Sequence, residues 1–404
     1  MNFREHAWQT GVAPRYTQIV NRPVELSGYL RSDVKYIVDG FIDMGSQTIT
    51  VPQGGLSIAG LGFGVSRLYS SVAGHTLFTD DGVYSGDLFI DRIDLESSGT
   101  GANIFDLDND QNRNAVETTN VNIWDTGSLG VLRNYRQGLW TNVALIRCVD
   151  GIECAGTWEG GFRADTAIIV PLGVAFTGTV FKAGAGLTMG GRFITDMNVE
   201  SIDDTAAFCD FSPANIVSDG RFQVSGLSVN PNSNSFPNMP SSSVKARFRN
   251  CDGVPNTYVG GQYKIGTEVA TNIVTQGVPV KIAGATPYTD LQHFTGAVDN
   301  SSTYIGTQEI GVNMYVDISF TGPNNDELTV TVRHWVDGSS SYVDLTESGK
   351  FTLGIAGRSA PISLHSFGTL NKNDRLEVWV TNTSSNGDVT AVSGGIVSIS
   401  ERSS

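Results

Sequence analysis

The sequence predicts an all-β protein in which a parallel β-solenoid is followed by an antiparallel β-sandwich or jelly roll. Residues 36–71 alternate short β-branched or aromatic pieces with glycine-rich turns. Strand-like pieces then recur to about residue 230, at intervals close to one solenoid turn. From about residue 278 the strands are longer and alternate cleanly between apolar and polar residues. No helical pattern of useful length interrupts these pieces, which disfavours an α/β sheet.

The opening turns of the solenoid are predicted in residues 36–71. The pieces YIV at 36–38, TITV at 48–51 and LSI at 56–58 each fit a short strand. Corners between such strands need a positive φ or a close approach of two backbones, and glycine allows both. Short strands joined by glycine corners are typical of stacked solenoid turns rather than of hairpins.

This pattern resembles the opening turns of right-handed β-helices of the pectate-lyase type. The residues that carry the resemblance are Gly40, Gly45, Val51-Pro52 with Gly54-Gly55, Ile58 with Gly60 and Gly62, and Ser66-Arg67-Leu68. Bacteriophage tailspikes and fibres commonly contain such helices. The resemblance therefore implies a right-handed β-helix and a phage virion component.

The bulk composition sets further limits. The chain has 404 residues, enough for two or three domains, and is 40% hydrophobic, enough to form a core. Its 47 glycines suit many turns between short strands. The formal net charge is −15, from 26 Lys and Arg against 41 Asp and Glu. Because phosphate binding needs clustered cations, this balance disfavours nucleic acid as a partner.

The N-terminal stretch MNFREHAWQTGVAPRYTQ has no apolar segment of the kind found in a secretion signal, so no signal peptide is expected. Assembly in the reducing cytoplasm of the host is expected because the cysteines are predicted to be free thiols. No stretch approaches eighteen apolar residues, which argues against membrane insertion. The four cysteines lack zinc-site spacing and are expected to be buried free thiols: Cys148, Cys154, Cys209 and Cys251. No cofactor is predicted.

Four segments are predicted. Residues 1–34 show no clean period and are interpreted as an N-terminal arm for virion attachment, or as a leader or cap of the solenoid. Residues 35–230 form the β-helix shaft. Residues 231–277 begin with the proline- and serine-rich PNSNSFPNMPSSSVK and form a linker or connector. Residues 278–404 form the jelly roll, expected to bind a receptor or to form a trimer.

The shaft strands are predicted from their spacing. Their centres are Ile93, Ile123, Leu145, Ile168, Met197 and Leu227. The steps between these centres are 30, 22, 23, 29 and 30 residues, close to one solenoid turn each. Within the strands, Ile93 and Leu95 should point one way, and Asp94 and Glu96 the other. A large irregular β-sandwich would give a similar list of strands and is the alternative.

The C-terminal strands are predicted from a period of two. In MYVDISFTG (314–322), DELTVTVRHW (326–335) and NDRLEVWVTN (373–382), apolar residues alternate with polar ones, as in a sandwich with one buried face. Together with TYIGTQ (303–308) and GGIVSIS (394–400), these strands are similar to the C-terminal domains of virion structural proteins of tailed phages, especially marine ones. This resemblance covers about the last 110 residues and implies a particle component.

Three groups of acidic residues could supply paired carboxylates for glycoside hydrolysis. They are Asp91 with Asp94 and Glu96, Glu153 with Glu159 and Asp165, and Asp196 with Glu200, Asp203 and Asp204. Outward-facing acids that keep a solenoid soluble are the alternative interpretation. No catalytic residue is assigned from the sequence.

One acidic run has the oxygen spacing of a calcium loop. Its candidate ligands are Asp106, Asp108, Asp110, Asn112 and Glu117. Gln111 replaces the glycine that the sharp bend needs, Arg113 adds a positive charge, and no flanking helices are predicted. A solvated acidic turn is the alternative.

Aromatic residues are candidates for binding a receptor glycan, since exposed rings stack on sugar faces. They are Trp124, Tyr135, Trp140 and Trp158 in the shaft, and Trp335 and Trp379 in the sandwich. Packing in the core or between subunits is the alternative.

The function expected from these features is that of a phage virion structural protein, either a tail fibre, a tailspike or a head fibre. It would be a homotrimer, joined to other virion proteins through the N-terminal arm, and would bind a host cell-surface glycan or protein. The alternative is a polysaccharide depolymerase, a hydrolase or lyase, that uses acidic residues on the β-helix surface. A cellular β-helix adhesin is a third hypothesis.

Overall fold

A computed structural model of the whole chain describes residues 14–110, 112–170, 172–196, 206–217, 220–229, 235–254, 257–284, 288–297, 300–306, 309–355 and 358–402. The chain divides into two compact units, Met1–Thr257 and Tyr258–Ser404. Both are built from β-strands, with short 3-10 helices at Pro23–Glu25 and Asp337–Ser339. Within the described residues, no helix has the length and apolar character to cross a membrane.

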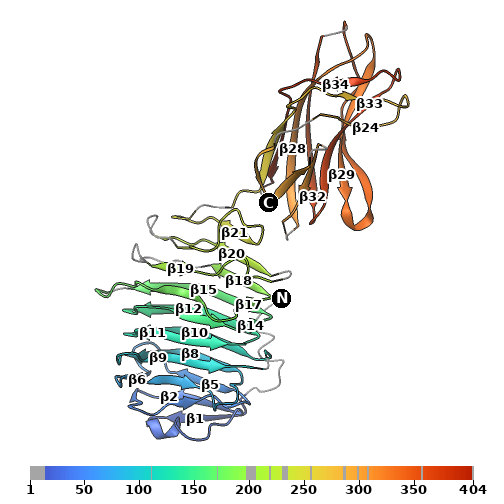
Figure 1. Cartoon of the computed structure of the whole chain (residues 1–404). Helices are drawn as coiled ribbons and strands as arrows, with labels where there is room; N and C mark the ends of the chain where they lie inside the picture. The colour runs from blue at the N-terminus through green and yellow to red at the C-terminus, as the bar shows by residue number, and fades with distance from the viewer. Residues whose placement is uncertain are drawn as a thin grey trace. The chain divides into compact units, whose positions relative to one another are not determined.

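The first unit is a parallel β-solenoid (Figure 1). Its long-strand sheet runs in the order β1 (Tyr16–Val20), β2 (Val34–Val38), β5 (Leu56–Gly60), β8 (Leu88–Ser97), β10 (Ala115–Trp124), β12 (Gln137–Ile146), β15 (Gly161–Val170), β18 (Arg192–Asp196), β20 (Arg221–Ser225) and β21 (Ala246–Arg249). The strands β3 (Phe41–Asp43) and β6 (Arg67–Ser70) join the same sheet.

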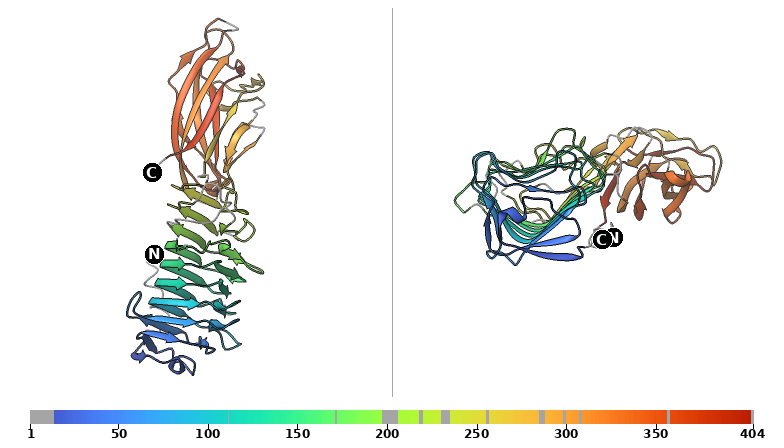
Figure 2. Two further views of the ribbon diagram at one scale, coloured as in Figure 1. Left: turned by 90° about the vertical axis from the view of Figure 1, so that its left-hand side faces the viewer. Right: turned by 90° about the horizontal axis from the view of Figure 1, so that it is seen from below.

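A second sheet closes each turn. It contains β4 (Ile49–Thr50), β7 (Thr76–Thr79), β9 (Asn103–Asp108), β11 (Ser128–Arg133), β13 (Ile152–Ala155), β16 (Thr179–Ala183) and β19 (Ala207–Cys209). A small third sheet pairs β14 (Thr157–Trp158) with β17 (Thr188–Met189). The views in Figure 2 show the strands stacked in layers and the chain winding around an interior. The predicted parallel solenoid is therefore confirmed.

The strand register gives the length of a turn. Val116 lies beside Leu88 on one side and Gly138 on the other, so successive turns take 28 and 22 residues (116 − 88 and 138 − 116). Ile123 pairs with Leu145, as their predicted spacing requires. Leu145 pairs with Ile169, one residue from the predicted centre Ile168, and the predicted centre Met197 lies outside the described residues.

A left-handed residue bends each of three long strands in the same place. Arg92, Asn120 and Asn142 have φ of 52°, 53° and 54°, and the ladder skips these three positions together. The bend resets the alternation, so that both Ile90 and Ile93, three residues apart, point into the core. The burial of Ile93 and Leu95 confirms the predicted inward face.

Aromatic side chains fill much of the solenoid core. Phe162, Phe193 and Phe222 occupy the same register position on successive turns. The ring centroids of Phe162 and Phe193 are 6.5 Å apart, and those of Phe193 and Phe222 are 4.8 Å apart, both pairs stacked. Such columns bury large apolar surfaces and hold adjacent turns in register.

The solenoid extends beyond both predicted boundaries. Strand β1 pairs in parallel with β2 from Tyr16 to Val20, so the predicted arm of residues 1–34 contributes the first solenoid strand. Four of the five β1 residues are exposed because β1 is an edge strand, which explains why the sequence shows no clean alternation there. The predicted connector of residues 231–277 is divided, since β21 belongs to the solenoid and β22 (Gly260–Lys264) to the second unit.

The second unit consists of two antiparallel sheets. The β28 sheet contains β23 (Ala270–Thr271), β34 (Val389–Ala391), β28 (Ile310–Thr321), β35 (Ile396–Glu401), β22, β25 (Tyr288–Gln292) and β32 (Ala360–Leu370). The β29 sheet contains β26 (Phe294–Ala297), β27 (Ser301–Tyr304), β33 (Arg375–Asn382), β29 (Glu327–Val336), β30 (Ser341–Glu347), β24 (Val280–Lys281) and β31 (Phe351–Thr352).

One hydrophobic core joins these two sheets. Val316 and Ile318 of β28 and Val330 and Val378 of the β29 sheet are all buried in it. Because strand residues alternate between faces, Tyr315 and Asp317 point outward. The antiparallel sandwich predicted from the period of two is therefore confirmed.

Candidate functional site

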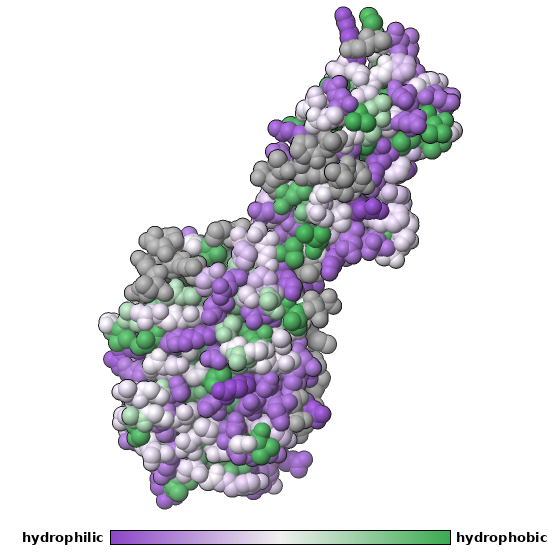
Figure 3. Space-filling model, in the orientation of Figure 1, coloured by the Kyte–Doolittle hydropathy of each residue, from purple (hydrophilic) through white to green (hydrophobic). Residues whose placement is uncertain are grey.

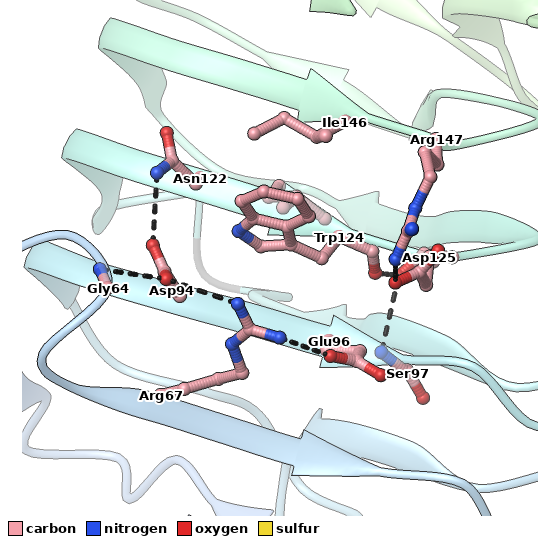
Figure 4. Close-up of polar contacts among 12 residues, drawn as sticks. Gly64, Arg67, Asp94, Glu96, Ser97, Asn122, Trp124, Asp125, Ile146 and Arg147 are labelled. Atoms are coloured by element: carbon pink, nitrogen blue, oxygen red, sulfur yellow. Dashed lines mark hydrogen bonds and ion pairs between the residues drawn. The ribbon is translucent and has the colours of Figure 1, made fainter. Parts of the chain in front are cut away.

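Charged and aromatic side chains form a ladder on the outward face of the solenoid (Figure 4). Strand pairing places Arg67 of β6 beside Asp94 of β8, and Asp94 beside Asn122 of β10. The next outward position holds Glu96 of β8 beside Trp124 of β10. Sequence analysis placed Asp94 and Glu96 in one acidic group and Trp124 among the aromatic candidates, and the parallel register brings them together.

Asp94 is the enclosed member of this ladder. Its side chain has no exposed surface. One carboxylate oxygen accepts hydrogen bonds from the backbone N–H of Gly64, at 3.1 Å, and from Arg67, at 3.5 Å. The other accepts one from Asn122 Nδ2 at 3.0 Å. With both oxygens bonded and no solvent contact, this carboxylate holds neighbouring turns together and is not placed to meet a substrate.

Arg67 links the two acids and the indole. Its guanidinium reaches Glu96 Oε2 at 2.8 Å and lies 5.0 Å from the centre of the Trp124 ring. Arg147, which forms an ion pair with Asp125, lies 5.8 Å from the same ring. Cations next to an aromatic face are stabilised by its quadrupole. The predicted glycan-binding residue Trp124 is thus half-buried between two arginines.

Among the described acids of the predicted groups, Asp91 and Asp165 are paired with arginines, Glu153 and Asp165 lie in different sheets, and Glu159 is exposed after β14. Asp91 forms an ion pair with Arg92 at 3.0 Å. Glu153 lies on β13, whereas Asp165 lies on β15 in another sheet and forms an ion pair with Arg163 at 2.7 Å. The side chains of the third group, Asp196, Glu200, Asp203 and Asp204, lie outside the part of the chain that the structure describes.

The predicted calcium loop is not formed, which corrects that expectation. Asp106 and Asp108 lie two residues apart on β9, so both face outward, and Glu117 lies on β10 in a different sheet. Asp110 lies in the exposed turn after β9, and Asn112 adopts a left-handed φ of 47°. The described residues contain no group of three His, Cys, Asp or Glu side chains that could hold a metal ion. A straight strand separates these acids instead of wrapping them around one centre.

Two of these acids nevertheless line a surface pocket of about 360 Å³. The lining residues are Thr79, Asp80, Gly82, Val83, Asp106, Asp108 and Arg133. Arg133 forms an ion pair with Asp106 at 2.7 Å, and Asn134 donates to Asp108 at 2.8 Å. Asp80 Oδ2 accepts the backbone N–H of Asp108 at 3.0 Å. Asp80 could not be predicted from the sequence, because its loop meets β9 only through the stacking of turns.

Three of the candidate glycan-binding aromatics are in the core, as the alternative interpretation expects, so glycan binding by these three is wrong. Tyr135, Trp140 and Trp158 each have 0% of their surface exposed. Trp140 packs against Phe162 and Phe181, with centroids 5.7 Å and 5.2 Å away. Trp158 donates its indole N–H to the backbone oxygen of Ala155 at 2.9 Å. These rings stabilise the solenoid and do not contact solvent.

The sandwich tryptophans belong to an aromatic ladder on the outward face of the β29 sheet. The rings of Trp335, Tyr342 and Trp379 follow one another at 4.9 Å and 5.2 Å. Arg375 lies 4.9 Å from the Trp335 ring, and Arg333 lies 4.7 Å from the Trp379 ring. An arginine and Tyr342, in edge-to-face geometry, therefore pack against each tryptophan, which leaves less ring surface for a sugar.

This ladder surrounds a buried carboxylate. Glu377 has a fully enclosed side chain and accepts the indole N–H of Trp379 at 2.9 Å. Lys281 and Arg375 lie 3.6 Å and 4.0 Å from its other oxygen. Burial, followed by the charge of Glu377, raises the pKa of Tyr342. These contacts join side chains from β24, β29, β30 and β33.

The sequence did not single out the most exposed aromatic side chains of the sandwich. Tyr315 and Phe367 are 50% and 63% exposed on the outward face of the β28 sheet, and His365 stacks on Tyr315 at 4.4 Å. Tyr315 could have been found from the sequence, because the alternation of apolar and polar residues over 314–320 already places it on the outward face. The space-filling view shows hydrophobic residues in small separate groups among hydrophilic ones (Figure 3).

Comparisons with known proteins assign no family. The sequence matches no protein-family model. It also matches no curated protein. Eiger TNF from S. frugiperda is similar in structure at 12% identity and a TM-score of 0.26, over 36% of this chain and 93% of its own. Murine APRIL is similar at 6% identity and a TM-score of 0.27, over 36% of this chain and 99% of its own. At these TM-scores neither likeness carries an argument.

Proposed function

We propose that the protein is a non-enzymatic attachment component of a virion, a fibre or spike in which the solenoid is a rigid shaft and the sandwich binds the host surface. It would act as a homotrimer, joined to other virion proteins through its N-terminal residues. The support is the combination of a β-solenoid with a separate antiparallel unit, together with the resemblance of both parts to phage virion proteins.

The observation that best supports this proposal is that charged side chains on the solenoid form bonds between neighbouring turns. Ion pairs join side chains of neighbouring turns, as in Arg67 with Asp94 and Arg133 with Asp106. Hydrogen bonds between turns also join Asn142 to Asn120 and Asn134 to Asp108. Carboxylates that form such bonds hold adjacent turns of the shaft together. They are unsuited to proton transfer with a substrate, because their oxygens are already bonded.

A second candidate function is a polysaccharide depolymerase at the pocket next to β9. The pocket of about 360 Å³ has room for part of a sugar chain, and three carboxylates line it: Asp80, Asp106 and Asp108. A hydrolase would need one of these as an acid and another as a base or nucleophile. Against this function, Asp106 is paired with Arg133, and Asp108 accepts a hydrogen bond from Asn134.

Three measurements test these functions. Immunogold labelling of purified phage particles, and fluorescence of the labelled full chain on host cells, should both be positive for an attachment component. Absence of the protein from particles would overturn the virion proposal. Release of reducing ends from host capsule or lipopolysaccharide, abolished by Asp108→Asn and by Asp80→Asn, would instead establish the depolymerase.

A further inference from the structure

The outward face of the β28 sheet combines exposed aromatic rings with small polar side chains. Tyr315 is 50% exposed and Phe367 is 63% exposed. The rings of Tyr315 and His365 are stacked, with centroids 4.4 Å apart and an interplanar angle of 3°. We call this surface the platform face. It consists of the outward side chains of β22, β35, β28 and β32.

Strand register arranges the platform face in three rows. The rows are Lys264, Ile396, Asp317 and Ser363, then Gln262, Ser398, Tyr315 and His365, then Gly260, Ser400, Asn313 and Phe367. In the second and third rows an aromatic ring therefore has a serine hydroxyl and a side-chain amide in the same row. In the first row Ser363 donates to Asp317 at 2.9 Å.

We propose that the platform face binds a neutral oligosaccharide. The apolar faces of sugar rings stack on aromatic side chains, and sugar hydroxyls exchange hydrogen bonds with amides, hydroxyls and carboxylates. Phe367 provides the exposed ring, with Asn313 opposite it on β28, and Tyr315 with His365 provides a second ring pair one row away. Opposed residues in adjacent strands are close enough for one sugar unit to contact both.

The charge of this face favours a neutral ligand over an anionic one. In these three rows the formal charges of Lys264 and Asp317 cancel, and next to the third row a single cation, Arg402, lies over Gly311. Recognition of a carboxylate or sulfate would need arginines or several lysines directed at the ligand. The arginine-rich surface of the sandwich, with Arg333 and Arg375, lies instead on the other sheet, where both arginines pack against tryptophans.

The composition of the rows also favours a sugar over a second copy of the chain. A stable subunit interface buries about 800 Å² on each partner around a largely apolar centre. On the platform face each row contains a serine, and the second and third rows, which hold the aromatic rings, also contain a side-chain amide. Scattered rings among hydroxyls and amides match the alternating apolar and polar surface of an oligosaccharide.

This inference deepens the proposed attachment function and is tested on the full chain. The probe is a panel of neutral oligosaccharides of glucose, galactose and mannose, with sialylated and sulfated glycans for comparison. We expect binding to neutral members, and at least a tenfold loss of affinity in both Phe367→Ala and Tyr315→Ala. Phe367→Tyr keeps the ring and should keep most of the affinity. Tyr29→Ala removes a 93% exposed ring on the solenoid and should change nothing.

The outcomes separate this inference from the attachment proposal. If the chain binds host cells and Phe367→Ala binds equally well, attachment stands and the platform inference is overturned. Preference for sialylated or sulfated glycans overturns it as well. If Phe367→Ala changes the oligomeric state in sedimentation velocity, the face is a subunit interface. If the wild-type chain binds neither cells nor glycans, both proposals fail. Circular dichroism of each variant confirms that a loss is not due to unfolding.

Discussion

Asn142 and Asn120 occupy the same corner on successive turns, and Asn142 Nδ2 donates to Asn120 Oδ1 at 2.8 Å. Both residues have a left-handed backbone, with φ of 54° and 53°. Asparagine tolerates this conformation better than other residues with a Cβ, because its short polar side chain can hydrogen-bond locally. The corner thus combines a backbone requirement with a bond between turns.

Asn142→Ala should lower the free energy of unfolding of the solenoid by about 1 kcal/mol, since alanine in a left-handed conformation is strained. Asn142→Gly loses the same hydrogen bond but removes the strain, so it should cost less. Urea denaturation followed by far-UV circular dichroism measures both variants. Equal losses for alanine and glycine would show that the side-chain bond, and not the backbone, determines the corner.

Arg67→Ala should destabilise the solenoid by about 3 kcal/mol, because it leaves the fully buried Asp94 without its cationic partner. Arg67→Lys keeps the charge but loses the geometry that reaches both Asp94 and Glu96, so its cost should be intermediate. Chemical denaturation measures these differences.

The matched control is Arg22→Ala, which removes an ion pair with Glu25 that is exposed to solvent. It should change stability little, because water screens such pairs. If Arg67→Ala lowers the free energy of unfolding no more than Arg22→Ala does, the stabilising role of the contact between Arg67 and Asp94 is contradicted.

Trp140 shows how far the sequence could predict the solenoid. Glycine corners, strand spacing and local alternation were enough to predict stacked parallel turns. They did not predict that Trp140 and Val143, three residues apart, both point inward, because the left-handed Asn142 between them reverses the alternation. A ring that was a candidate for glycan binding therefore lies in the core.

Strand β28 could be predicted in detail, whereas the contacts of Asp94 on the solenoid could not. Uniform alternation in β28 has no such bend, so its buried and exposed faces could be predicted residue by residue. The neighbours of Asp94 could not, since Gly64, Arg67 and Asn122 meet it only through pairing between turns. Their sequence separations depend on variable loops that no local pattern specifies.

Cys251 should react first with a thiol reagent such as Ellman's reagent. Its side chain is half-buried, whereas Cys148, Cys154 and Cys209 are buried. Burial raises the pKa of all four thiols, that of Cys148 to about 12, which reduces the reactive thiolate. Native protein at pH 8 should show one faster phase that Cys251→Ser removes, and urea should release the other three. A fast phase that persists in Cys251→Ser would contradict this burial.

Asp87→Asn should stabilise the protein at neutral pH. Burial raises the pKa of Asp87, although the backbone N–H of Ala115 donates to its carboxylate at 2.7 Å and partly offsets this effect. The pKa of Asp87 is higher in the folded protein than in the unfolded chain, so ionisation of this carboxyl group lowers the free energy of unfolding as pH rises from the unfolded to the folded pKa. Below the unfolded pKa the group is protonated in both states and has no such effect. The gain from asparagine should therefore be full at pH 7 and disappear near pH 3.

Asp33→Asn, in the same solenoid, should change the stability at neutral pH in the opposite direction. A hydrogen bond from Arg31 holds the pKa of Asp33 below its ordinary value. The ionised carboxylate therefore stabilises the fold above the unfolded pKa, and this stabilisation is lost as pH falls through the folded pKa. Asp33→Asn should accordingly lose stability at pH 7 and match the wild type at low pH. Thermal unfolding of both variants between pH 3 and pH 7 checks the pair, and curves that shift in the same direction would contradict the burial assigned to Asp87.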